Sequence, residues 1–207
     1  TASAGTGKPG EKGRKIKMKT KLALLLLAAG SLLYAQENNL VRNGKIDQKP
    51  SKTTNGLPVG CLAVNAPGWG HWNAKGSEGK VWQFNGKNAG FDDDFAILVK
   101  NMKQGCVLQS IKVEAGKEYT VKALCKKTGS AKVTLTVGWQ NEKGGWAYHK
   151  FNQNTEFSKT LKDGWHEASA TVKVPDGARW LALMANIQNQ SGEDVCWFDN
   201  FMVSLSK

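Results

Sequence analysis

The sequence predicts an all-β protein, an antiparallel β-sandwich preceded by a signal peptide. Three observations lead to this fold class. Short segments alternate apolar and polar residues, Gly, Asn, Asp and Pro separate these segments at regular spacing, and no long segment has helical periodicity. The chain has 207 residues, of which 40% are hydrophobic and 22% charged, and this composition excludes a disordered tail and a polytopic membrane protein.

The expected strands follow one another through most of the chain. Residues 133–140 alternate apolar and polar side chains with a period of two, and residues 181–188 do the same. A series of short strands with turn signals between them is typical of a β-sandwich. No repeat or linker divides residues 36–207, so we expect a single domain there. The expected strands are residues 80–84, 95–100, 106–113, 119–125, 133–140, 166–174, 181–188 and 195–205.

Residues 18–35 are expected to be a secretory signal peptide. Two lysines close to Met18 form its positive start, residues 22–33 form its apolar run, and Ala35 ends its cleavage site. The alternative is a transmembrane anchor, but an anchor needs roughly 20 apolar residues and this run is shorter. We therefore expect residues 36–207 to be secreted or periplasmic.

Residues 1–17 precede this signal peptide and are rich in Lys, Arg, Gly and Glu. Codons made only of purines encode these four amino acids, so we expect a translated ribosome-binding region rather than part of the natural protein. The first 35 residues hold half of the net charge of +12. The other half is spread without a basic run, so no nucleic-acid partner is expected.

The four cysteines all follow the predicted cleavage site. An even number of cysteines in an exported chain predicts two disulfides, and four cysteines allow three connectivities. Their spacing is too wide for a CxxC zinc motif. The cysteines are Cys61, Cys106, Cys125 and Cys196.

Several motifs in order resemble the family 4/9/22 carbohydrate-binding modules, which are galactose-binding-like jelly rolls. The chain has NLVRNGKID at residues 39–47 and WFDNFMV at 197–203, and the resemblance covers about residues 38–205. Lys45 and Ile46 depart from the acidic residue and Phe of the family pattern, and Asp47 stands where Glu is usual. The motifs between these two are at residues 67–69, 107–113, 114–121 and 163–174.

The resemblance implies a jelly-roll sandwich and a structural calcium ion. In such modules an early acidic residue and the closing Asp often hold the ion, and the matching positions are Asp47 and Asp199. Both residues are alternatively turn or cap residues, and Lys45 disfavours a cation. Residues 92–94 form a second acidic cluster that is expected to be a solvated loop.

The same resemblance implies a disulfide pairing. In this topology residues 119–125 and 195–205 are expected to be neighbouring antiparallel strands. Cys125 would then face Cys196, and Cys61 would pair with Cys106.

The aromatic residues divide into core and surface candidates. Trp69, Trp165 and Trp197 occupy family landmark positions and are expected in the core. Trp139 lies on the apolar side of its strand, and Trp180 is ambiguous because it begins one. The aromatics without a clear structural role are Trp72, Trp82, Trp146 and Tyr148. Exposed indoles offer flat apolar faces against which sugar rings pack.

Amide side chains complete the candidate site. Gln140, Asn186 and Gln188 lie on the polar faces of two expected strands, and amides both donate and accept hydrogen bonds. With Trp146 and Tyr148 they would line a concave groove, although each is alternatively an ordinary surface residue.

The predicted function is a secreted, non-catalytic module that binds a polysaccharide or oligosaccharide. Glutamates 142, 156 and 167 form no evident catalytic pair, no GxSxG motif is present, and no separate catalytic domain fits beside the family motifs. The partner is a glycan, the protein is expected to be monomeric, and no membrane contact is expected after signal cleavage. A protein-binding or adhesion sandwich is the alternative, because jelly rolls serve many tasks.

Overall fold

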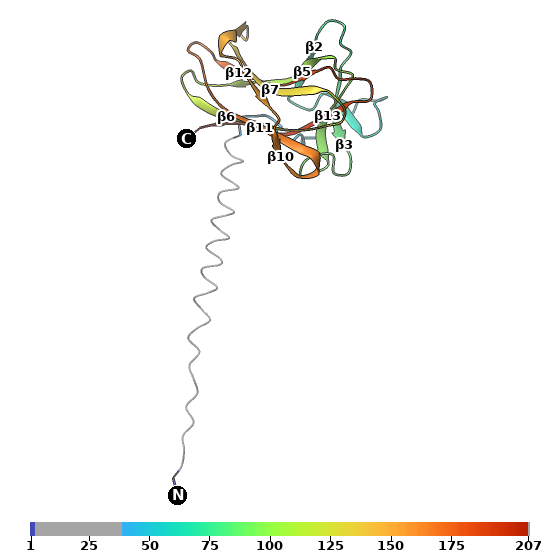
Figure 1. Ribbon diagram of the computed structural model, residues 1–207, viewed down its shortest axis with the longest axis vertical. Helices are drawn as coiled ribbons and strands as arrows, with labels where there is room; N and C mark the ends of the chain where they lie inside the picture. Colours follow the sequence, from blue (N-terminus) through green and yellow to red (C-terminus); the bar gives the residue numbers. More distant parts are fainter. Residues whose placement is uncertain (3–38, 207) are drawn as a thin grey trace. The chain divides into compact units, whose positions relative to one another are not determined.

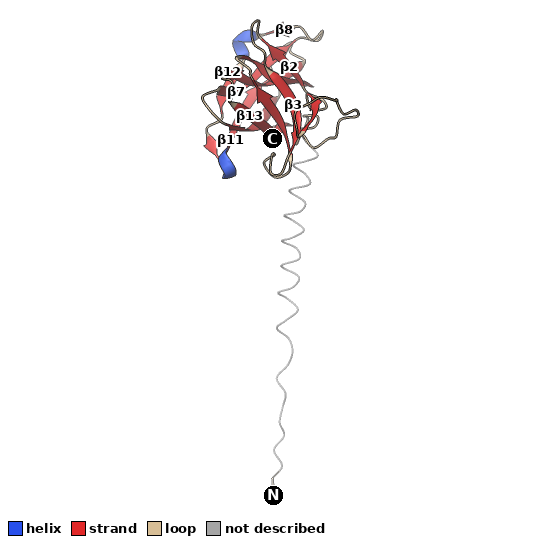
Figure 2. Cartoon of the chain, turned by 90° about the vertical axis from the view of Figure 1, so that its right-hand side faces the viewer, coloured by secondary structure: helices blue, strands red, loops and turns tan. Residues whose placement is uncertain are grey.

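The computed structural model describes residues 1–2 and 39–206 and confirms an all-β antiparallel fold for this part of the chain. The predicted signal peptide and residues 3–17 of the predicted upstream stretch lie outside the described residues. Thirteen strands form two sheets, and two 3₁₀ turns are the helical elements of residues 39–206 (Figures 1 and 2). Within those residues no helix is long and apolar enough to cross a membrane.

The larger sheet has seven strands in the order β1-β3-β4-β13-β6-β11-β10, and every pair is antiparallel. β13, which is the last strand in the sequence, lies between β4 and β6 in the middle of this sheet. The strands are β1 (Cys61–Val64), β3 (Lys80–Asn85), β4 (Phe95–Lys100), β6 (Glu118–Lys127), β10 (Lys159–Thr160), β11 (Trp165–Lys173) and β13 (Val195–Leu205).

The smaller sheet has six strands. Five follow the order β2-β5-β12-β7-β8, and β9 also pairs with β7. In Figure 1, β2, β5, β7 and β12 form one layer and β3, β6, β10, β11 and β13 the other. The strands are β2 (Gly70–Asn73), β5 (Gln104–Lys112), β7 (Lys132–Gln140), β8 (Trp146–Ala147), β9 (Gln153–Glu156) and β12 (Trp180–Gln188), and the 3₁₀ turns are η1 (His149–Phe151) and η2 (Lys162–Gly164).

The period-two pattern places the core between the two sheets. In β12, Leu181, Leu183, Ala185 and Ile187 are fully buried in the main hydrophobic cluster, and the odd-numbered residues of β7 join them. Since successive side chains on a strand point to opposite faces, the even-numbered residues of both strands lie on the outer face of the six-stranded sheet. This outer face is where most of the predicted site residues are found.

The tryptophans predicted to be core residues are buried, with Trp197 only partly so. Trp139 and Trp165 are each 1% exposed. The indole N–H of Trp139 donates to the Phe151 carbonyl at 2.9 Å, which satisfies its polar atom inside the core. Trp69 packs against Phe201 with ring centroids 4.2 Å apart. Trp197 packs, partly buried, against a smaller cluster on the other side of the seven-stranded sheet.

The prediction of two disulfides is wrong, because all four cysteines are free thiols. Strands β6 and β13 are neighbours as expected, but the register pairs Cys196 with Lys127 and Cys125 with Phe198, so the two cysteines are diagonal rather than opposite. Burial raises the pKa of Cys196 to about 12. Cys61 packs near Trp82 on the outside of the seven-stranded sheet, whereas Cys106 belongs to β5 in the other sheet.

Candidate functional site

One row of side chains crosses the outer face of the six-stranded sheet. Trp180 on β12 pairs directly with Gln140 on β7, and Gln140 pairs with Trp146 on β8. Directly paired residues of antiparallel strands share a face, so these three side chains lie side by side. Adjacent strands lie about 4.8 Å apart, which puts the two tryptophan backbones on the order of 10 Å apart with Gln140 between them.

The central amide of this row is free to bind a ligand. Gln140 is 8% exposed and Trp146 is 49% exposed. No side-chain hydrogen bond found within residues 39–206 involves the Gln140 amide, so its two donor hydrogens and its acceptor oxygen have no protein partner there. Gln83 Oε1 is the one side-chain oxygen or nitrogen atom of the described residues that is both buried and unpaired, so the Gln140 amide still reaches solvent and is accessible to a ligand.

A second row reaches the opposite edge of the same face. Trp72 on β2 is 54% exposed and pairs with Cys106, which in turn pairs with Asn186 on β12. The Asn186 amide donates to the Thr136 hydroxyl at 2.7 Å, and this hydroxyl donates to Asn154 Oδ1 at 2.6 Å. The centre of the outer face is therefore a hydrogen-bonded line of amides and a hydroxyl, with an exposed indole on each outer strand.

The structure brings most of the predicted binding residues together. Five of them lie on this outer face. Gln188, the last residue of β12, is exposed and pairs with Gln104 on β5 and Lys132 on β7. These five are Trp72, Gln140, Trp146, Asn186 and Gln188.

Two predicted residues lie elsewhere. Trp82 is 8% exposed and packs with Leu98 and Val195 on the outside of the seven-stranded sheet, so the prediction of an exposed aromatic is wrong. Tyr148 has a left-handed backbone (φ 58°), packs against the main core, and places its hydroxyl against Gly177. Its ring is therefore not part of the outer face beside Trp146.

Sequence reasoning missed Trp180 and Met184, which also lie on this face. The signal was present, because the period of two over residues 181–188 puts residue 180 on the same side as Asn186 and Gln188. Trp180 was ambiguous only because it stands at the start of its strand.

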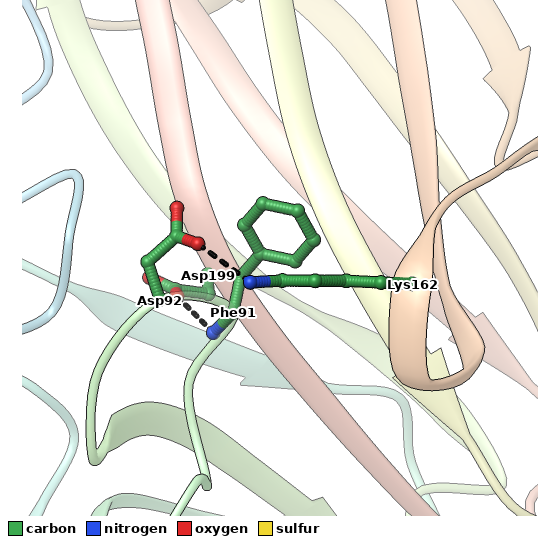
Figure 3. A network of polar contacts seen from close by, with 4 residues as sticks. All are labelled: Phe91, Asp92, Lys162 and Asp199. Atoms are coloured by element: carbon green, nitrogen blue, oxygen red, sulfur yellow. Dashed lines mark hydrogen bonds and ion pairs between the residues drawn. The ribbon is translucent and has the colours of Figure 1, made fainter.

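The two residues implied as calcium ligands are in different environments. Asp47 is exposed, whereas Asp199 is 1% exposed. The Asp199 carboxylate accepts a hydrogen bond from the backbone N–H of Phe91 at 2.8 Å (Figure 3). It accepts another from the backbone N–H of Asn200 at 2.6 Å. Burial nevertheless raises the pKa of Asp199 to about 7, with Asp93 and Asp92 adding charge repulsion.

A cluster of oxygen atoms lies beside Gly90. A Cβ atom at Gly90 would collide with Asp93 Oδ1 and the Phe95 carbonyl oxygen and would lie 3.1 Å from Asp199 Oδ2. Two carboxylates and a carbonyl around a position without a side chain suit a hard cation. Among residues 39–206, no group of three His, Cys, Asp or Glu side chains is arranged to hold a metal ion. A cation at this position would therefore be held by the carboxylates of Asp93 and Asp199 and the Phe95 carbonyl oxygen. The charge of Asp47 contributes to raising the pKa of Asp93.

A pocket of about 450 Å³ adjoins this cluster on the side of the seven-stranded sheet. Lys162 crosses it, with Nζ 3.0 Å from Asp92 Oδ1 and 4.8 Å from the Phe91 ring centroid (Figure 3). The ammonium group covers the aromatic face that a ligand would need. The Asp92–Lys162 pair is exposed on both sides, so it adds little stability.

A sandwich of two antiparallel sheets with aromatic and amide side chains on one outer face is typical of ligand-binding β-sandwich modules. The chain belongs to the carbohydrate binding domain family CBM_4_9, whose model matches residues 38–192. No curated protein matches the chain.

Solved structures share the fold at low sequence identity. The tailspike protein 4 enzymatically active domain of bacteriophage CBA120 is 14% identical over 81% of this chain and 21% of its own, with a TM-score of 0.58. TmCBM61 in complex with β-1,4-galactotriose is 16% identical over 81% of this chain and 99% of its own, with a TM-score of 0.51. The Clostridium thermocellum xylanase 10B CBM22-1–GH10 modules with xylohexaose are 16% identical over 71% of this chain and 28% of their own, with a TM-score of 0.50. The chain thus spans about a fifth of the tailspike chain and about a quarter of the xylanase chain.

Proposed function

We propose that the protein is a secreted, non-catalytic module that binds a polysaccharide or oligosaccharide on the outer face of its six-stranded sheet. The observation that carries this proposal is the row Trp180–Gln140–Trp146. The C–H faces of a sugar ring pack against indoles, and an amide both donates to and accepts from vicinal hydroxyls. A ring that lies over this row meets both kinds of contact at once.

The polarity of the face favours a neutral glycan. Its centre consists of the amides and hydroxyl of Asn186, Thr136 and Asn154. Three charged residues lie at the margins of this face: Lys112 pairs directly with Trp180 at the end of β5, Lys132 begins β7, and Glu156 is on the short strand β9. Neutral hydroxyls therefore find hydrogen-bond partners along the centre of the face.

Two structural neighbours support the ligand class. TmCBM61 was solved in complex with β-1,4-galactotriose, and the xylanase 10B modules were solved in complex with xylohexaose. Both ligands are oligosaccharides, so a glycan of several rings is the class to test first.

A hydrolytic role has little support from the same face. Glycoside hydrolysis requires two carboxyl groups that flank the scissile bond. The strands of the six-stranded sheet contribute one carboxylate, Glu156, and Glu167 lies in the other sheet, paired with Lys159 at 2.9 Å.

The test is affinity electrophoresis through gels that contain xylan, galactan, mixed-linkage glucan or mannan. At least one of these glycans should retard the wild type, and Trp146→Ala should weaken retardation roughly fivefold, since one aromatic contact contributes about 1 kcal/mol. The matched control is Leu205→Ala, which removes a side chain of similar exposure, 54%, from the seven-stranded sheet. If no neutral glycan retards the wild type, the proposal fails and an adhesion or protein-binding role takes its place.

The proposal includes a structural calcium ion held by Asp93, Asp199 and the Phe95 carbonyl. A bound divalent cation would neutralise the two carboxylates beside Gly90 and so stabilise the folded state. Millimolar Ca²⁺ should raise the thermal unfolding midpoint of the wild type, and Asp199→Asn should abolish this shift. Asp47→Asn, the control, should keep it. A midpoint that does not respond to Ca²⁺ after chelator treatment would remove the ion from the proposal.

Export is the remaining part of the proposal, and it rests on the sequence of residues 18–35. N-terminal sequencing of the protein from its native host should begin at Gln36. A mature protein that still carries residues 1–17 would contradict both the signal peptide and the upstream-translation hypothesis.

A further inference from the structure

The two central strands of the six-stranded sheet carry unusually small residues beside the aromatic row. Gly138 on β7 pairs directly with Ala182 on β12, and both lie on the outer face, two residues from Gln140 and Trp180. Ala182 is fully buried although it points away from the core. Another side chain must therefore cover it from outside.

The indole of Trp146 lies over Gly138, beside the side chain of Met184. A Cβ atom at Gly138 would lie 2.9 Å from Cζ3 of Trp146 and 3.0 Å from Cε of Met184. Trp146 pairs with Gln140, so its ring extends back along β7 from that residue and over Gly138. With 49% of the residue exposed, part of the side chain rests on the sheet and part remains open to solvent.

We infer that Gly138 forms a seat that holds the Trp146 indole against the sheet, which makes Gly138 a positioning residue of the glycan site. This inference rests on the proposed function. Stacking on a sugar requires a ring whose orientation is fixed before the ligand arrives, because ordering a loose side chain on binding lowers affinity. A residue with a Cβ at position 138 would displace the ring from the seat.

The first experiment compares Gly138→Ala with Gly70→Ala. Gly70 lies on β2 of the same sheet, and a Cβ there would have only Leu108 O as a neighbour, at 4.0 Å. Neither glycine has a positive φ, so the alanine is compatible with the backbone at both positions. Gly138→Ala should weaken binding to the retarding glycan roughly three- to fivefold, and Gly70→Ala should leave it within twofold.

The second experiment shows whether the loss acts through Trp146. In a Trp146→Ala background, Gly138→Ala should cause no further loss, because the ring that the seat positions is already gone. Independent losses that multiply would show that Gly138 affects binding by another route and would overturn the inference.

A measurement without any glycan tests the seat directly. The chain has eight tryptophans, and the indole N–H signal that disappears in Trp146→Phe identifies Trp146 in a ¹H–¹⁵N spectrum. Gly138→Ala should shift this signal and leave the other indole signals in place. If the signal does not move, the seat is wrong even if the protein binds glycans. If no glycan binds the wild type but the signal moves, the seat stands and the proposed function fails.

Discussion

At the residue scale, the most informative side chain is Gln140. The residue is 8% exposed, its amide makes no side-chain hydrogen bond within residues 39–206 but still reaches solvent, and one indole stands on each side of it. Water can bind this amide in the free protein, and hydroxyl groups of a ligand would replace that water. The amide is therefore expected to serve binding and to contribute little to stability.

This expectation gives the first prediction. Gln140→Leu keeps the volume of the side chain and removes the amide, so glycan affinity should fall by roughly tenfold while the free energy of unfolding changes by less than about 1 kcal/mol. Isothermal titration calorimetry and urea unfolding measure the two quantities. A stability loss as large as the affinity loss would mean that the amide serves the fold instead.

At the element scale, the turns that lead into β7 and β13 are tied together by one carboxylate. Asp194 accepts hydrogen bonds from the backbone N–H of Ser191 at 3.1 Å and of Ser130 at 3.2 Å. Gly129, in the same turn as Ser130, has φ +75°, and a Cβ there would collide with the Asp194 carboxylate. The two turns thus close over a single acidic group.

These hydrogen bonds predict how stability depends on pH. They lower the pKa of Asp194 below its usual value of 3.8, with Ser191 as the largest cause. A lowered pKa means that the stabilisation is complete above the unfolded-state value and is lost as the pH falls through the lower, folded-state value. Asp194→Asn should therefore destabilise the protein at pH 7, and this destabilisation should become smaller as the pH falls below 3.8.

Urea unfolding at pH 7 and at pH 3 tests this prediction. Glu193→Gln is the control, because it removes the charge of the exposed neighbouring residue. An equal effect of Asp194→Asn at both pH values would show that the carboxylate charge has no part in joining the turns.

At the scale of the whole molecule, the two outer faces of the sandwich differ. The six-stranded sheet leaves Trp72 and Trp146 exposed, whereas the seven-stranded sheet covers Trp82 and Leu98 with a second apolar cluster. An exposed aromatic surface on one face only is typical of a binding module.

The sandwich is also held together without cross-links, which gives the last prediction. Cys106, Cys125 and Cys196 are buried and Cys61 is partly exposed, and all four are free. A thiol reagent should titrate four thiols in denatured protein, and Cys61 alone should react readily in the native protein. Fewer than four thiols after unfolding without reductant would show that a disulfide forms despite the diagonal register of Cys125 and Cys196.

The fold and the shared face of several candidate site residues were predictable because period-two patterns determine which side of a strand is buried. That rule placed Gln140, Asn186 and Gln188 on one face. It failed for Trp82, which lies on the outer face of its sheet but is covered by a cluster that includes Leu57. The residues that cover Trp82 come from other parts of the chain, so the alternation of residues within its own strand cannot predict its burial.

Backbone geometry explains two other differences. Tyr148 follows β8 directly, but a left-handed backbone turns its ring toward the core. The cysteine pairing depended on a register that strand adjacency alone does not determine. In both cases the sequence predicted which elements meet, whereas the direction of individual side chains was set by turns and registers.

The shortness of β8 has a consequence for how this protein could change its ligand. β8 joins the sheet through two residue pairs only, Trp139–Ala147 and Gln140–Trp146, whereas the seat at Gly138 belongs to a nine-residue strand. The aromatic platform and the surface that supports it therefore belong to separable parts of the chain. We therefore expect that insertions or exchanges in the connection around β8 change which ligands bind while the rest of the sandwich stays unaltered.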